Sequence, residues 1–269
     1  MSSAWLLCLK GILFRETLRF FQQRERFFAA LVRPLVWLIV FAAGFRAALG
    51  LSIIEPYESY IVYEVYIVPG LCGMIQLFNG MQSSLSMVYD REMGSMRMLM
   101  TTPLPRWYLL FCRLLASTFV SILQVYAFLF IALAFGIDLP TAGFLTIFPA
   151  LIVGGVMLGS LGLLLAATIK QLENFAGIMN FVIFPMFFLS SALYPLWKMQ
   201  ESSEILYWIC QVNPFTHAVE FIRFALYLQF NAAALGWSAL ALALFAAAAL
   251  WVYSPSRGLK GGGGPPGRG

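Results

Sequence analysis

The side chains best suited to chemistry are His217, Glu220 and Arg223, which follow one another at helical spacing in an otherwise apolar part of the chain. An imidazole of this kind can serve as a general acid or base. Residues three positions apart on a helix also meet as local polar contacts, without any catalytic role. Two interpretations therefore stand at this point: a structural contact, and the site of an integral membrane enzyme that modifies lipid.

Other catalytic and cofactor sites have less support. His217 is the single histidine among 269 residues, whereas a metal site needs several converging ligands. The sequence contains neither a Gly-x-Ser-x-Gly nucleophile motif nor a Gly-x-x-x-x-Gly-Lys-Ser/Thr phosphate-binding loop. We therefore expect no cofactor to bind to this chain. If ATP drives the protein, ATP and Mg²⁺ bind to a partner chain.

A short charged segment between two long apolar runs suggests a binding surface. Apolar residues recur in it at helical spacing, and Pro103 and Pro105 then stop the helix. A helix over residues 90–103 would present one apolar face, edged with charge, to another protein. The residues expected at this contact are Asp90, Arg91, Glu92, Met96, Arg97 and Leu99.

The composition is that of an integral membrane protein. Hydrophobic residues make up 61% of the chain and charged residues 11%, and the mean hydropathy is +0.83. Segments long enough to cross a hydrocarbon core, which takes about 20 helical residues, lie at 31–49, 66–89, 107–135, 146–169, 175–194 and 232–253. We therefore predict an all-α polytopic membrane protein with six transmembrane helices. Residues 205–212 and 215–230, within the external segment 195–230, are too short or too polar to span and resemble a re-entrant pair.

Amide and hydroxyl side chains line one face of the second predicted span. At the helical period an arc of roughly 80° holds Cys72, Gln76, Asn79, Ser83, Ser86 and Asp90. Polar groups at membrane depth are costly against lipid, so this face must meet protein or water. It belongs either to a translocation pathway or subunit interface, or to helix contacts inside one protomer.

The fifth predicted span carries an aromatic face made of Phe181, Phe184 and Phe188. Such a face suits contact with a greasy substrate, and phenylalanine is equally an ordinary lipid-facing residue. Asn174 and Ser191 lie at the two ends of the same face. These polar ends favour a protein interface.

The N-terminal residues 1–30 read as an amphipathic helix that lies in the membrane interface. The helical period places Arg15, Arg19 and Arg26 on one edge and bulky apolar residues on another. The arginines would contact lipid headgroups or a partner protein. Both roles fit the pattern.

The distribution of positive charge predicts the orientation in the membrane. If the N-terminus is cytoplasmic, only Arg46, Lys198 and Arg223 of the 17 lysines and arginines fall outside. Both termini and residues 90–103 are then cytoplasmic, and the protein lies in the inner (plasma) membrane. The net charge is +5, and most of the positive side chains lie on the predicted cytoplasmic side, where the membrane surface is anionic. We therefore expect membrane lipids, and no nucleic acid, as partners of these charges. A transmembrane domain over residues 31–253 precedes a flexible tail, 254–269, rich in glycine and proline.

The chain resembles the ABC-2 type permeases, the membrane subunits of ABC exporters for drugs, lipids and polysaccharides. Two motifs on the six-span plan carry the resemblance. They are Asp90-Arg91-Glu92-x-Gly94 leading to Thr102-Pro103 after the second span, and Asn213-Pro214-Phe215-Thr216-His217-Ala218-Val219-Glu220-x-x-Arg223 before the sixth. The resemblance extends from about residue 4 to residue 253.

The resemblance implies the permease subunit of an ATP-driven exporter for an amphiphilic or hydrophobic substrate. Residues 90–103 would be the coupling helix, docked on a separate ATPase subunit present in two copies, with the N-terminal helix as a second contact. Two permease copies would face each other, with the second and fifth spans lining the pathway. The segment that would cap the exit contains Asn213, His217, Glu220 and Arg223. An importer subunit and a membrane scaffold remain as alternatives.

Overall fold

The computed structural model describes residues 2–22, 24–45, 55–57, 62–92, 104–169 and 171–252. Within these residues the fold is all helical, as predicted. The helices are α1 (Ser2–Gln22), α2 (Arg24–Phe45), α3 (Tyr63–Glu92), α5 (Arg106–Ala134), α6 (Gly143–Thr168), α7 (Leu172–Phe188), α8 (Leu196–Ser202), α9 (Glu204–Val212), α10 (Pro214–Leu226) and α11 (Ala232–Val252).

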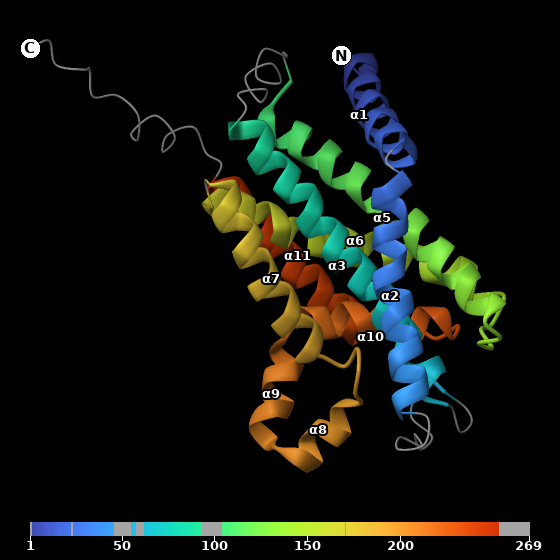
Figure 1. The fold of residues 1–269 in the computed structure, drawn as a ribbon. Coiled ribbons are helices and arrows are strands. Elements are labelled where there is room, and N and C mark those ends of the chain that lie inside the picture. Colours follow the sequence, from blue (N-terminus) through green and yellow to red (C-terminus); the bar gives the residue numbers. More distant parts are fainter. Residues whose placement is uncertain are drawn as a thin grey trace, which may run out of the picture.

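Helix α3 is the central element of the fold. It contacts α2, α5, α6, α7 and α10, and it runs through the middle of the molecule in Figure 1. Ile67, Val68, Leu71 and Leu77 on this helix have no exposed surface. A helix surrounded by neighbours needs apolar residues on most of its faces, which explains its long apolar sequence.

Small residues let α3 and α6 approach closely. A Cβ atom on Gly80 would come within 3.0 Å of the backbone of Gly159, and one on Gly162 within 2.8 Å of the Gly80 carbonyl oxygen. Side chains larger than hydrogen at these positions would force the two helices apart. The α3–α6 contact therefore depends on its glycines.

Three helices of the described residues are long and apolar enough to cross a membrane: α5 (over Trp107–Ala134), α6 and α11. Three further predicted spans coincide in position with α2, α3 and α7. The apolar stretches of α2 and α7 are shorter, at Leu31–Val40 and Leu172–Phe188. The six-span plan as a whole stays a prediction.

Helix α7 ends earlier than the predicted span 175–194. It stops at Phe188, and residues 189–195 turn back toward α8. The Asn213 side-chain amide donates hydrogen bonds to the carbonyl oxygens of Met186 and Leu189, at 2.8 and 2.6 Å. These bonds satisfy carbonyl groups that a helix end leaves without a partner, so a residue distant in sequence stabilises this end.

The N-terminal helix predicted over residues 1–30 falls on α1 and the start of α2. The described helix α1 ends at Gln22, and α2 begins at Arg24 and continues to Phe45. Arg15 and Arg19 therefore lie on α1 and Arg26 lies on α2.

Parts of the predicted organisation lie outside the described residues. These are residues 93–103, which hold most of the predicted coupling helix, and the tail 254–269. Asp90, Arg91 and Glu92 form the last turn of α3. The external helical pair predicted at 205–212 and 215–230 corresponds to α9 and α10, and Figure 1 shows α8 and α9 extending from the end of the bundle.

Candidate functional site

The polar face of α3 makes contacts within the protomer. The Gln76 amide donates to the Leu151 carbonyl oxygen on α6 at 2.6 Å, and Asn79 donates to the Gln124 side chain on α5. Gln76 is 1% exposed. For these two side chains the structure favours helix contacts inside one protomer, and a role in the pathway stays a prediction.

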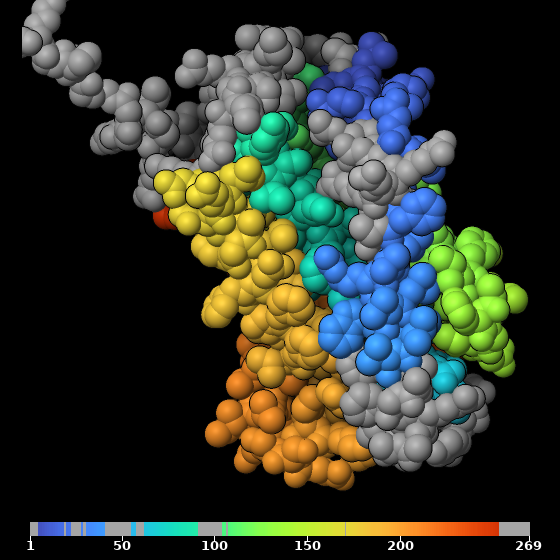
Figure 2. Space-filling view, viewed as in Figure 1, coloured from blue at the N-terminus to red at the C-terminus, as the bar shows by residue number. Residues whose placement is uncertain are grey.

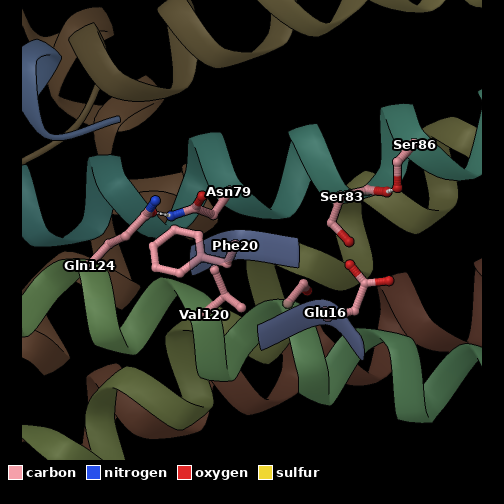
Figure 3. Close-up of a pocket in the computed structure, with 8 residues that line it drawn as sticks. Glu16, Phe20, Asn79, Ser83, Ser86, Val120 and Gln124 are labelled. Carbon is pink, nitrogen blue, oxygen red and sulfur yellow. Dashed lines mark hydrogen bonds between the residues drawn. The ribbon is translucent and has the colours of Figure 1, made fainter. Parts of the chain in front are cut away.

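A polar cavity lies beside this face, between α1, α3 and α5. Its lining residues are Glu16, Phe20, Asn79, Ser83, Ser86, Ser117, Val120 and Gln124, and its volume is about 50 Å³. Figure 3 shows the Glu16 carboxylate and the Ser83 hydroxyl pointing toward one another across it. Ser83 thus differs from Gln76, because its side chain faces open space. Glu16 stands between Arg15 and Thr17 and carries no sequence signal of a cavity, whereas Gln124 is a lone amide between apolar residues and was a signal that could have been used.

The end of α3 nearest the predicted coupling helix is tied to α5. Arg113 on α5 forms an ion pair with Asp90, and Arg113 is 8% exposed. Arg91 and Glu92 follow in the same turn of α3. The other predicted coupling residues, Met96, Arg97 and Leu99, lie outside the described residues.

Asn213 joins α7 to α10. Its Oδ1 atom accepts a hydrogen bond from the Phe215 backbone at 3.0 Å, which caps the start of α10. Its amide nitrogen caps the end of α7. The Asn-Pro motif predicted a turn or helix start. The link to α7 was not foreseeable, because it joins segments distant in sequence.

Arg223 is the centre of a buried polar cluster at the other end of α3. It is 2% exposed, pairs with Glu220, and donates to the Ser191 carbonyl oxygen at 2.8 Å. Its guanidinium carbon lies 4.1 Å from the centre of the Tyr66 ring, and the Tyr66 hydroxyl also donates to Ser191, at 2.8 Å. This cluster connects α3, α10 and the turn after α7.

His217 has its own set of partners. Its Nε2 atom lies 2.9 Å from the Gln211 carbonyl oxygen, and its ring stacks on Trp237 of α11 with centroids 5.5 Å apart. Burial lowers the pKa of His217, against the opposing effects of the Gln211 hydrogen bond and the Glu220 charge. The contacts of His217 and of Arg223 are thus structural in kind, which weakens the interpretation of an enzymatic site.

The aromatic face of α7 is exposed on the protomer. Phe181 is 79% exposed, Phe184 44% and Phe188 38%. Phe188 contacts Trp37 of α2, with ring centroids 5.7 Å apart. Figure 2 shows α7 on the open surface of the molecule, in yellow. In this chain alone, each of the three rings of the predicted face is more than one third exposed.

Helix α1 is anchored to the start of α5. The Tyr108 hydroxyl donates to the Trp5 carbonyl oxygen at 2.6 Å, and the two rings lie 4.4 Å apart. Arg15 donates to Glu16 at 2.8 Å, and its side chain is 51% exposed. Arg15 is therefore exposed enough to contact lipid headgroups or a partner protein.

Comparison with known proteins identifies the family of the chain. Residues 8–227 match the family described as ABC-2 type transporter. The chain is 28% identical to transport permease ycf38 of Porphyra purpurea, over 80% of this chain and 72% of that protein. It is 29% identical to its counterpart in Cyanophora paradoxa, over 73% of this chain and 66% of that protein.

A third relative is a probable multidrug ABC transporter permease, YbhR, of Escherichia coli strain K12. The identity is 28%, over 68% of this chain and 49% of the relative, so the chain spans about half the length of that permease. The matched residues 8–227 contain helices α2 to α10 and the whole polar face of α3. The chain belongs to the ABC-2 type transporter family, the membrane permease subunits of ABC transporters.

Proposed function

We propose that this chain is the permease subunit of an ATP-driven exporter, which moves an amphiphilic or hydrophobic substrate out of the cell between two permease copies. The observation that carries the proposal is the continuity of α3. This single helix runs from Tyr63 to Glu92, about 45 Å at 1.5 Å per residue. It joins the segment predicted to bind an ATPase to the buried Arg223 cluster.

Movement at one end of α3 would reach the other through specific contacts. In the proposed mechanism, closure of two partner ATPases on ATP pushes residues 90–103, and α3 shifts as a rigid element. The Asp90–Arg113 ion pair carries α5 along. At the opposite end, Tyr66 and Arg223 share the Ser191 carbonyl oxygen, so the turn after α7 and helix α10 move together.

A second copy of the chain would cover the aromatic face of α7. Phe181 is 79% exposed, and a pathway bounded by such rings from two copies would suit a greasy or amphiphilic substrate. Lipid contact alone would also satisfy these rings. Cross-linking through a cysteine at residue 181 separates the two arrangements.

The orientation follows from the charge bias. With both termini cytoplasmic in the inner membrane, the end of α3 at Glu92 faces the cytoplasm and the Arg223 cluster lies outside. ATP and Mg²⁺ bind to the ATPase subunit, present in two copies, and this chain binds neither. Its remaining contacts are with membrane lipids.

ATP-dependent movement of a fluorescent phospholipid analogue tests the proposal. The chain is reconstituted in liposomes with the ABC ATPase that co-purifies with it, and ATP is added on the side that carries the ATPase. We expect the analogue to move to the opposite leaflet, and not with an ATPase that cannot hydrolyse ATP. Movement toward the ATPase side would indicate an importer, and no ATP-dependent movement of any amphiphile would indicate a scaffold. Either result would contradict the proposal.

The enzymatic alternative has its own discriminating variant. His217→Gln keeps a hydrogen-bonding group at this position and removes the titrating imidazole. A general acid or base contributes about 10²- to 10⁴-fold to a rate, so an enzyme would lose at least that factor. We expect transport by the variant to stay within a few fold of the unmodified protein.

A further inference from the structure

The cavity between α1, α3 and α5 has a polar part of unusual composition for a site beside apolar helices. Glu16 contributes a carboxylate, and three serines and two amides contribute oxygen atoms that accept hydrogen bonds. None of the eight lining residues is basic. The side chains of this cavity therefore favour a group that is positively charged and rich in donors.

The size of the cavity narrows the choice of group. Its volume of about 50 Å³ corresponds to about three to five water molecules, since each needs about 10–15 Å³. A primary ammonium group, with three donors on one nitrogen, fits this space. A sugar ring does not. A divalent metal ion is disfavoured, because the lining offers one carboxylate and hard divalent cations take several oxygen ligands.

An apolar surface adjoins the polar part. Phe20 and Val120 form one wall of the cavity. Phe20 is 6% exposed, so its ring faces the interior of the protein. A hydrocarbon chain attached to the ammonium group would find apolar contacts on this side. The polar side chains of the cavity thus suit a charged head group, and Phe20 and Val120 suit the first carbons of a chain attached to it.

Arg15 is a competing cation that the described residues place beside Glu16. It donates to Glu16 at 2.8 Å through a side chain that is 51% exposed, and exposed pairs of this kind are weak. A carboxylate has two oxygen atoms with several acceptor sites. Glu16 can therefore accept from a ligand inside the cavity while Arg15 stays on the outer side.

We propose that this cavity binds the protonated primary amine of an amphiphile, with Glu16 as the charged partner and Ser83 as a hydrogen-bonding partner. The inference rests on the proposed function in one respect, since it names the substrate class of the permease. It makes an amine head group, rather than the apolar tail alone, the feature that this chain recognises.

Equilibrium binding to the full chain in lipid nanodiscs, without the ATPase, tests the proposal. The probes are dodecylamine and 1-dodecanol, which share one tail, and empty nanodiscs correct for partition into lipid. We expect saturable binding of dodecylamine to the chain and none of the alcohol. Equal binding of the two probes would overturn the proposal, as would dodecylamine binding no better than to empty nanodiscs.

Two variants and one matched control locate the site. Glu16→Gln removes one charge-assisted hydrogen bond and should weaken dodecylamine binding about tenfold or more. Ser83→Ala, which keeps the carboxylate, should weaken it about fivefold. Glu173→Gln removes an exposed carboxylate at the start of α7 and should change nothing. Unchanged binding in both Glu16→Gln and Ser83→Ala, or equal loss in Glu173→Gln, would contradict the assignment.

Inorganic cations are distinguished in the same assay. Excess Na⁺ or K⁺ should leave dodecylamine binding within twofold, and displacement at matched ionic strength by one of them would assign the cavity to that ion instead. Because no ATP is present, a negative result here leaves the transport result standing. A failure of ATP-driven transport with intact amine binding would contradict the exporter alone.

Discussion

Arg113 on α5 forms an ion pair with Asp90 in the final turns of α3, and only 8% of the arginine is exposed. The two residues lie on the helices that flank residues 93–103, the predicted contact for the ATPase. Any displacement of that contact therefore acts on two helices at once. Because the Arg113 side chain is more buried than that of Asp90, the stability of the protein should depend on which of the two residues is removed.

We predict that loss of Asp90 is more damaging than loss of Arg113. Asp90→Leu leaves a guanidinium without its carboxylate in a site where the arginine side chain is 9% exposed, which costs about 3 kcal/mol or more. Arg113→Met leaves a carboxylate that is 22% exposed and can reach water. Thermal unfolding of the purified protein measures the difference. The double variant should be more stable than Asp90→Leu, and a double variant as unstable as the sum of the singles would contradict this prediction.

Asn213 should matter more for stability than an ordinary helix cap. Asn213→Ala removes two hydrogen bonds to α7 and one to the start of α10, and we expect a loss of about 2 to 3 kcal/mol. Asn231 caps α11 with one side-chain bond, to the backbone nitrogen of Ala234 at 2.9 Å. Asn231→Ala should therefore cost about 1 kcal/mol. Equal shifts of the unfolding temperature in the two variants would show that the link to α7 contributes nothing.

His217 should make the protein less stable in acid. Burial holds the pKa of His217 below 6.5 in the folded protein, so the folded state favours the neutral ring. The stability that the neutral His217 ring contributes is fully present above the pKa that this residue has in the unfolded chain. It is lost as the pH falls through the lower pKa that the residue has in the folded protein. Unfolding temperatures from about pH 7.5 to about pH 5 should fall more steeply for the unmodified protein than for His217→Gln. Parallel curves would contradict the assignment.

Cross-linking tests whether a second copy covers α7. Phe181→Cys and Leu145→Cys place a thiol at positions that are 79% and 81% exposed, on α7 and α6 respectively, in a Cys8→Ser background because the other three cysteines are buried. A short bis-maleimide in native membranes should join two copies at residue 181 and not at residue 145. Equal cross-linking at both positions would indicate random collision, and the proposed dimer face would then be wrong.

Much of the helical plan could be predicted from local patterns. Long apolar runs predict α5, α6 and α11 because each run contains its own signal. The cavity could not be predicted, since Glu16, Ser83 and Ser117 come from three helices whose packing is not written in any one segment. The Asn213 bonds to Met186 and Leu189 are equally remote. For the polar face of α3, the spacing of the residues predicted that the face meets protein or water instead of lipid. The spacing could not tell that Gln76 contacts another helix whereas Ser83 lines a cavity.

The ATPase activity of the complete complex tests the central claim most directly. We expect the partner ATPase to co-purify with the chain and to hydrolyse ATP faster in the presence of substrate. Arg91→Glu and Glu92→Ala should abolish this stimulation while the permease still inserts in the membrane, and Glu173→Gln should retain it. Normal stimulation in both coupling variants, or the absence of any ATPase partner, would contradict the account.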